Sequence, residues 1–146
     1  MTDETIQPAH WTSDEIAVLV TGLLFVVAAS MPWYEAIVGV DKVGYRAWDL
    51  GISAVPAVVL ALYAAVRTGW LKRRPLPPEV PLSPGAEPFA AAMLAFVLTT
   101  YRTLDVPYIA HADRVERTLW LSLALGLVVL QAVCALRVVA RTGLRA

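Results

Sequence analysis

The sequence has little charge and few of the residues that carry metal or acid–base chemistry. Of its 146 residues, 16% are charged, two are His and one is Cys, and the formal net charge is zero. A soluble domain usually has about 25% charged residues. A neutral chain offers no basic surface for nucleic acid. The single Cys134 excludes both an intramolecular disulfide and a metal site built from cysteines.

Signatures of catalysis are also missing. The chain has no Gly-rich phosphate loop, no Ser-His-Asp or Cys-His arrangement and no H-E-x-x-H spacing. His10 and His111 both lie outside the long apolar segments, which argues against bis-histidine haem ligation. His111 has Asp113 nearby, and a solvated loop is favoured there over a metal site. The sequence therefore predicts a protein that is not an enzyme and has no cofactor.

Apolar residues are what the chain has in abundance. They make up 58% of the sequence and gather in four blocks. A spanning helix needs roughly 20 apolar residues to cross about 30 Å of hydrocarbon. We therefore predict an all-α membrane protein with one domain, residues 1–146, folded as a four-helix transmembrane bundle. The spans are expected at about 16–33, 48–67, 88–107 and 118–139.

The segment between the first two expected spans has its own pattern. Two β-prone runs, 36–40 and 43–48, flank Asp41-Lys42, which predicts a short outer loop or hairpin between helices 1 and 2. Trp33-Tyr34 precedes these runs. Because Trp and Tyr favour the headgroup level of a bilayer, this pair is expected to anchor the end of the first span.

The third block reaches spanning length only if Arg102 enters the membrane with it. Arg102 would then lie roughly 20 Å along a helix that begins at Phe89, where a charge is costly and usually faces a partner or a wet cavity. Asp105, Asp49 and Glu35 are possible partners. Two interpretations stay open: an ion pair or snorkelling cation with a structural role, or a site for an anion or a lipid headgroup.

Two further features predict contacts between helices. Gln131 lies about midway along the fourth span, where an amide usually bonds to a neighbouring helix. Small residues recur every four positions in the second and third blocks and would allow close helix approach, inside the bundle or with a partner. These stripes are Ser53, Ala57, Ala61 and Ala65, then Ala91, Ala95 and Thr99.

The distribution of Lys and Arg predicts the orientation. Loop 67–87 and the C-terminal tail together hold seven, and the other two loops hold five. Since cytoplasmic loops are rich in cations close to span ends, we expect both termini in the cytoplasm of a bacterial plasma membrane. The cluster Lys72-Arg73-Arg74 could also contact anionic lipid, at about 1 kcal/mol for each cation.

Several short motifs resemble a known group. Met31-Pro32-Trp33-Tyr34, Ala47-Trp48-Asp49 and the segment 101–107 with Arg102 are similar to motifs of uncharacterised small four-helix membrane proteins of actinobacteria. The resemblance implies the four-helix topology and adds no activity, because the function of that group is unknown. It draws attention to Arg102 and Asp49, which match recurring features of the group.

Two functions are compatible with these features. The first is an accessory or scaffolding subunit of a larger membrane complex, which packs in the lipid bilayer against other membrane proteins or copies of itself. The alternative is a small transporter, channel or lipid- or anion-binding protein that acts as a homo-oligomer and uses Arg102. Native purification separates the two.

Overall fold

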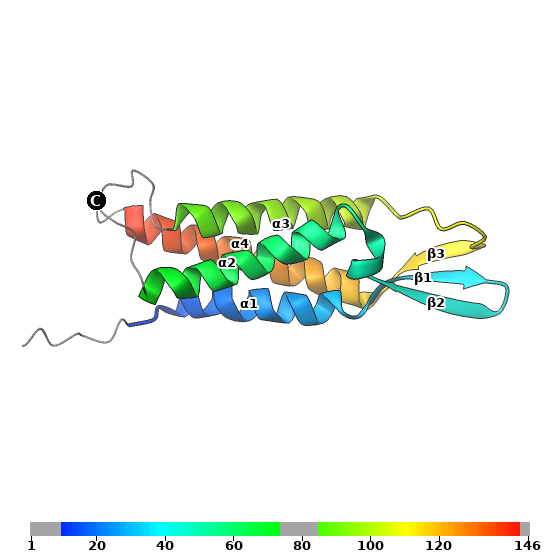
Figure 1. The fold of residues 1–146 in the computed structure, drawn as a ribbon, viewed down its shortest axis with the longest axis horizontal. Helices are drawn as coiled ribbons and strands as arrows, with labels where there is room; N and C mark the ends of the chain where they lie inside the picture. The colour runs from blue at the N-terminus through cyan, green and yellow to red at the C-terminus, as the bar shows by residue number, and fades with distance from the viewer. Residues whose placement is uncertain (1–9, 74–84, 144–146) are drawn as a thin grey trace, which may run out of the picture.

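The computed structural model describes residues 10–73 and 85–143, which form four helices and a small sheet. The helices lie side by side in an elongated bundle, and the strands project from one end of it (Figure 1). The elements in chain order are α1 (Ser13–Ala29), β1 (Pro32–Val38), β2 (Asp41–Arg46), the short 3-10 helix η1 (Ala47–Leu50), α2 (Ala54–Arg73), α3 (Ala86–Leu104), β3 (Arg114–Arg117) and α4 (Leu119–Gly143).

The helices alternate in direction around the bundle. α1 and α3 run toward the sheet, and α2 and α4 run away from it (Figure 1). α1 packs mainly against α2 and α4, and α3 packs mainly against the same two helices.

Alanine fills much of the space between the helices. The buried helical residues include Ala57, Ala61 and Ala65 of α2 and Ala91 and Ala95 of α3. Ser53 and Thr99, the remaining members of the two small-residue stripes, are buried as well. The expected helix contacts are confirmed, and both stripes face neighbouring helices of the same chain. They are therefore not free to hold a partner.

The three strands form an antiparallel sheet in the order β2-β1-β3. β1 is central, with Glu35 opposite Gly44 on one side and opposite Glu116 on the other. β3 comes from the connection between α3 and α4, so it joins that connection to the one between α1 and α2. Pairing on both edges gives β1 a stability that an isolated hairpin lacks.

The first residues of β1 pack against the end of the helix bundle. Trp33 and Tyr34 are both fully buried, although successive residues of a regular strand point to opposite faces. The register between β1 and β2 shifts between Pro32 and Tyr34, and such a bulge re-aims side chains. The Trp33 indole donates to the Ala28 carbonyl at 2.9 Å and packs edge-on against Phe25. The expectation of exposed anchors at this pair is wrong, because the bundle end covers both rings.

The prediction of a four-helix transmembrane bundle with four spans is also wrong. Among the described residues, one stretch, Leu119–Thr142 of α4, is long and apolar enough to cross a membrane. α1 has 17 residues, and the apolar part of α2 is limited to Ala54–Trp70, so both fall short of roughly 20 residues. α3 has 19 residues and includes Glu87 and Arg102. The fold class is not all-α either, since the chain contains a three-stranded sheet.

The hairpin between α1 and α2 is present, with a different turn from the one expected. Val38 pairs with Asp41, so the two-residue loop is Gly39-Val40 and not Asp41-Lys42. Gly39 has φ +61°, a conformation that glycine adopts without steric cost and that tight hairpin loops require. The Asp113 carboxylate accepts from the Gly39 N–H at 2.7 Å, which ties the turn to the approach to β3.

Gly22 marks the closest approach between helices. A Cβ atom added there would lie 2.7 Å from the Ala65 Cβ, 2.7 Å from the Gln131 Nε2 and 2.9 Å from the Ala61 carbonyl oxygen. All three distances are under 3.0 Å, which is shorter than the contacts that Cβ atoms make in proteins. The absence of a side chain at Gly22 therefore sets the separation of α1 from α2 and α4.

We predict that Gly22→Ala destabilises the bundle by about 1–3 kcal/mol, because overpacking a filled interior outweighs the gain in helix propensity. The matched control is Gly126→Ala in α4, where an added Cβ meets nothing within 4 Å, and which should be neutral or stabilise by up to about 1 kcal/mol. Thermal unfolding followed by circular dichroism measures both. Equal melting temperatures for the two variants would contradict the close approach.

Candidate functional site

Arg102 lies where the sheet meets the helices. It occupies the last turn of α3, beside the start of α2 and below β1. Its Nε donates to the Ser53 Oγ at 3.0 Å, and its two Nη atoms lie 3.5 Å from the Leu50 and Asp105 carbonyl oxygens. All three acceptors are uncharged. The side chain is partly buried, so the guanidinium holds the end of α3 against the start of α2.

The carboxylates expected near Arg102 are bonded elsewhere. Asp49 accepts from the Arg46 N–H at 2.9 Å and caps η1. The Asp105 carboxylate lies near the Tyr101 hydroxyl and raises the pKa of Tyr101. Glu35 lies 3.7 Å from the Lys42 ammonium. Within residues 10–73 and 85–143, none of these three carboxylates lies within ion-pair distance of the Arg102 guanidinium. Asp105 contributes its backbone carbonyl to Arg102 instead.

Tyr34 also lies at this junction, although the sequence predicted it to be a membrane anchor. Its hydroxyl donates to the Arg102 carbonyl, one of the carbonyls that the end of a helix leaves without an intrahelical partner. Burial raises the pKa of Tyr34, while the guanidinium groups of Arg117 and Arg102 act in the opposite direction. The phenol thus stays protonated and donates to α3 throughout the physiological pH range.

Arg117, the last residue of β3, approaches the same hydroxyl from the other side. Its Nη2 lies 3.3 Å from the Leu104 carbonyl oxygen, and its guanidinium is near enough to the Tyr34 hydroxyl to oppose the rise in the pKa of Tyr34. Tyr34 and Arg117 are opposite one another in the sheet. Two guanidinium groups therefore surround one buried phenol. No local sequence signal places Arg117 here, because the contact depends on the pairing of β1 with β3.

Gln131 forms the interhelical contact that its position predicts. It is completely buried, and its Nε2 donates to the Val18 carbonyl of α1 at 3.2 Å and to the Ala61 carbonyl of α2 at 2.9 Å. Its Oε1 is buried without a hydrogen-bond partner. One amide of α4 therefore links three helices at the narrowest part of the bundle.

A second charged cluster lies at the opposite end of the bundle. The buried Asp14 carboxylate of α1 is 2.8 Å from the Arg141 Nη2 and 3.9 Å from the Arg137 Nη1, both on α4. The acid lies in the first turn of α1 and Arg141 in the last turn of α4, where each opposes the helix dipole. This cluster holds the two helix ends together.

The expected contact of anionic lipid with Lys72, Arg73 and Arg74 falls outside the residues whose side chains the structure describes. Its neighbour Arg67 is described: its Nε donates to the Glu87 carboxylate at 2.9 Å, and the Tyr63 hydroxyl donates to the same carboxylate. These contacts link α2 to the first turn of α3.

His111 is exposed, and among the described residues no three His, Cys, Asp or Glu side chains gather as metal ligands would.

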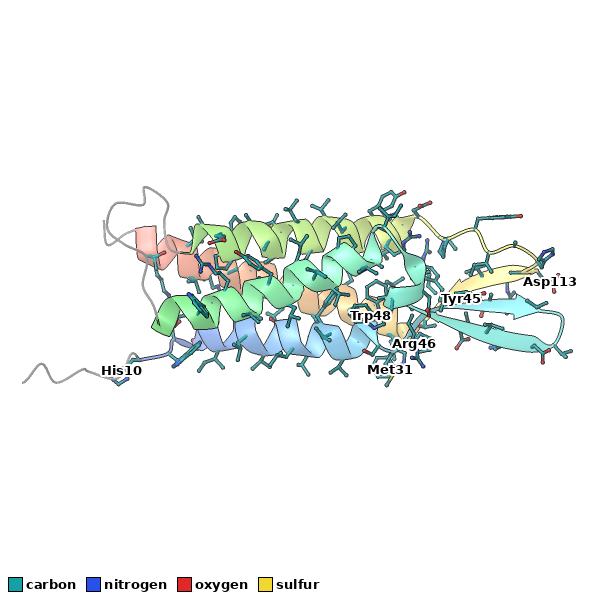
Figure 2. The ribbon with its side chains drawn as sticks, viewed as in Figure 1. His10, Met31, Tyr45, Arg46, Trp48 and Asp113 are labelled. Atoms are coloured by element: carbon teal, nitrogen blue, oxygen red, sulfur yellow. The ribbon has the colours of Figure 1, made fainter. Side chains whose placement is uncertain are left out.

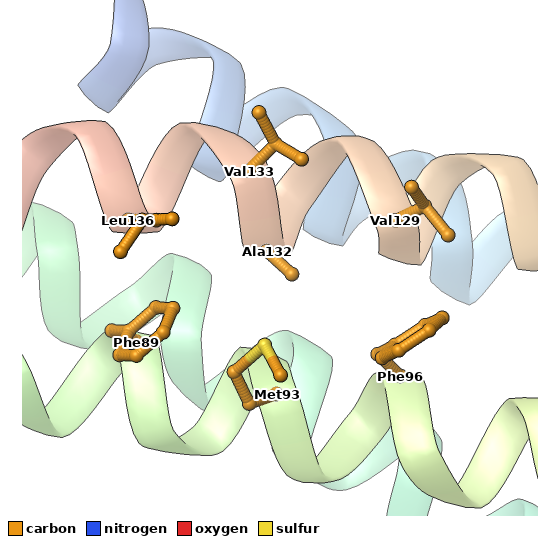
Figure 3. Close-up of a pocket in the computed structure, with 7 residues that line it drawn as sticks. All are labelled: Phe89, Met93, Phe96, Val129, Ala132, Val133 and Leu136. Atoms are coloured by element: carbon orange, nitrogen blue, oxygen red, sulfur yellow. The ribbon is translucent and has the colours of Figure 1, made fainter.

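An apolar groove runs between α3 and α4 on the outside of the bundle. Its volume is about 340 Å³. Figure 3 shows three side chains from α3 facing those of α4 across it. The α3 wall consists of Phe89, Met93 and Phe96. The α4 wall consists of Val129, Val133 and Leu136, with the small Ala132 between them. No polar atom lines the groove, so it suits hydrocarbon and not a polar substrate.

Comparison with known proteins adds no assignment: no family model matches the chain, and neither the curated proteins nor the solved structures contain a significant match. The resemblance to actinobacterial membrane proteins stays a prediction. The function must therefore be inferred from this chain's own residues.

We predict that Tyr34→Phe destabilises the protein by about 1–3 kcal/mol, because the partly buried Arg102 carbonyl loses its hydrogen-bond donor. Tyr108→Phe is the matched control, since Tyr108 is almost fully exposed. Chemical denaturation measures the difference. A Tyr34→Phe variant as stable as Tyr108→Phe would show that the hydroxyl does not hold the end of α3.

The Tyr63–Glu87–Arg67 contacts predict a dependence on pH. Hydrogen bonds from Tyr63 and Arg67 hold the pKa of Glu87 below its usual value of about 4.5. A lowered pKa in the folded state stabilises the fold at neutral pH, and this contribution is lost as the pH falls through the folded-state pKa. The carboxylate is partly exposed, so solvent screening keeps the effect small. Glu87→Gln should lower the melting temperature at pH 7 and not at pH 3, and equal shifts at both values would contradict this role.

Proposed function

We propose that this chain is a membrane-associated accessory protein without enzymatic activity, which packs against other membrane proteins. The single observation that carries the proposal is the apolar outer surface of the bundle, which includes the groove between α3 and α4. The other features described below support it.

α4 supports the association with a membrane. Leu119–Thr142 is long and apolar enough to cross one, and its last turns carry Arg137 and Arg141. Cations near the end of a crossing helix favour the cytoplasmic side. We therefore place the end of α4 on the cytoplasmic side of a bacterial plasma membrane. The sheet then lies on the outer side.

Exposed aliphatic side chains occur on each of the four helices. Large apolar patches on a surface usually mark contacts with a membrane or with other proteins. Examples of half-exposed residues are Leu23 and Leu24 on α1, Val59 on α2, Leu94 and Val97 on α3, and Leu130 and Leu136 on α4. An exterior of this composition favours an apolar environment or apolar partners.

The groove is where we expect a partner to bind, and its occupant is an apolar helix of another membrane protein. One wall belongs to α4, the helix of crossing length, so the groove lies at membrane depth. Ala132 lies between the larger side chains of that wall, and a small residue at this position allows a helix backbone to approach closely. The small-residue stripes of α2 and α3 are already buried inside the bundle, which leaves the groove as the site for a partner.

The alternative function, anion or lipid binding at Arg102, is favoured by a different observation. The Arg102 guanidinium contacts only uncharged oxygens. A transporter or channel receives less support, because the interior between the four helices is filled by Ala, Phe25 and the Gln131 amide. Any pore would require several copies of the chain.

The proposal predicts that purification in mild detergent recovers a stoichiometric complex with another membrane protein. Met93→Trp should reduce recovery of the partner at least about tenfold, because an indole fills the groove and overpacking at a contact costs about 1–3 kcal/mol. Leu94→Trp is the control, since Leu94 is exposed on the same helix and does not line the groove.

Two outcomes would contradict the proposal. One is a chain that purifies alone or only with copies of itself. The other is a partner lost equally from the Met93→Trp and Leu94→Trp variants, which would place the contact outside the groove.

A further inference from the structure

We infer that the guanidinium groups of Arg102 and Arg117 form a site for a phosphate group, supplied by the headgroup of a phospholipid in the leaflet where α4 begins. The inference concerns the sheet end of the bundle, far from the groove assigned to a protein partner. Only the lipid source of the phosphate rests on the proposed membrane association.

Arg102 has hydrogen-bonding capacity to spare. A guanidinium carries five N–H donors, and three are directed at Ser53, Leu50 and Asp105. Two of those three contacts are 3.5 Å long, at the limit of a hydrogen bond. A charged oxygen would be a better acceptor for the Nη atoms, because charge-assisted bonds are about twice as strong as neutral ones.

Arg117 adds a second cation at the same place. Its Nη2 reaches the Leu104 carbonyl, next to the Asp105 carbonyl that Arg102 contacts, and the Tyr34 hydroxyl, which donates to the Arg102 carbonyl, lies nearby. Strand pairing fixes Arg117 opposite Tyr34, so neither arginine can withdraw without breaking structural contacts. Two like charges held close together repel one another, and a shared anion relieves that repulsion.

The carboxylates nearby leave positive charge in excess. Asp105 is close enough to influence the Tyr34 hydroxyl together with both arginines, and it lies near the Tyr101 hydroxyl. Asp49 caps η1, and Glu116 pairs with Arg114. Two guanidinium groups facing one carboxylate carry a net positive charge, and their planar forks match the oxygens of a phosphate.

The surroundings favour a lipid as the source of the phosphate. Arg117 precedes by two residues the start of α4 at Leu119, so it lies at headgroup level when α4 crosses a membrane. Three aliphatic side chains adjacent to the site are almost fully exposed: Ile52 is 95%, Leu119 81% and Leu104 74% exposed. Each lies within two residues of a group that lines the site.

Partly exposed aromatic rings lie around the same end of the bundle. Trp48, Trp120 and Tyr101 are 44%, 37% and 53% exposed, and Figure 2 shows Trp48 at the sheet end of the helices. Aromatic rings of this kind collect at the boundary between hydrocarbon and headgroups. Cations, exposed aliphatic side chains and aromatic rings together fit a phospholipid better than a free ion.

The experiment titrates the full-length protein in mild detergent with short-chain phosphatidylglycerol and, separately, with inorganic phosphate, and follows tryptophan fluorescence. Saturable binding of the lipid should weaken at least about fivefold in Arg117→Gln, which removes a charge-assisted contact. Arg114→Gln, on the same strand and exposed, should change the affinity less than about twofold. Because Arg102 also holds α2 to α3, Arg102→Lys is the second variant, and it should weaken binding while keeping the melting temperature within a few degrees.

Each result bears on the inference. Lipid binding that depends on Arg117 supports it, and binding of inorganic phosphate alone with the same dependence overturns the lipid source. Equal affinities for Arg117→Gln and the unmodified chain, equal losses in Arg114→Gln and Arg117→Gln, or no saturable binding of either probe overturn the site itself. None of these measurements needs a protein partner, so a chain that purifies alone and binds the lipid would contradict only the proposed function.

Discussion

The hydrogen bond from the Tyr34 hydroxyl to the Arg102 carbonyl joins the two parts of this molecule. Tyr34 belongs to the central strand, and Arg102 ends the third helix. The bond supplies a donor to a helix end that has lost its own. The bulge that buries Trp33 and Tyr34 together, the pairing of β3 with β1 and the position of Arg117 are all needed to keep this contact in place. The sheet is therefore part of the bundle's end and not an appendage.

The charged side chains at the two ends of the bundle have different kinds of partner. At one end the Asp14 carboxylate is buried against Arg141 and Arg137, so opposite charges are paired. At the other end Arg102 contacts uncharged oxygens, and the carboxylates around it bond to backbone or to other side chains. A paired cluster fixes the geometry of two helices. An arginine without a carboxylate partner retains attraction for an anion, and this is why the binding inference concerns the sheet end.

Predictions about helix contacts, which rest on local signals, are confirmed. The small-residue stripes of α2 and α3 predicted helix contacts, and those residues are buried. Gln131 was expected to bond to a neighbouring helix, and it bonds to two. The number of membrane spans was overestimated because the length of each apolar block was taken as the length of its helix. α1 ends at Ala29 when the chain enters β1, and a block of apolar residues does not show where its helix stops.

By itself, the sequence determined that four apolar helical segments exist, which of their faces are small enough to pack closely, and that a β-prone hairpin follows the first. Those features depend on residues a few positions apart, whose interactions follow from the period of a helix or strand. The tertiary structure alone decided that β3 joins the hairpin, that the Tyr34 hydroxyl bonds to the end of α3 and that Arg117 reaches Leu104. Each of these contacts connects residues 13 or more positions apart, and their pairing is fixed by how the whole chain packs and not by any local pattern.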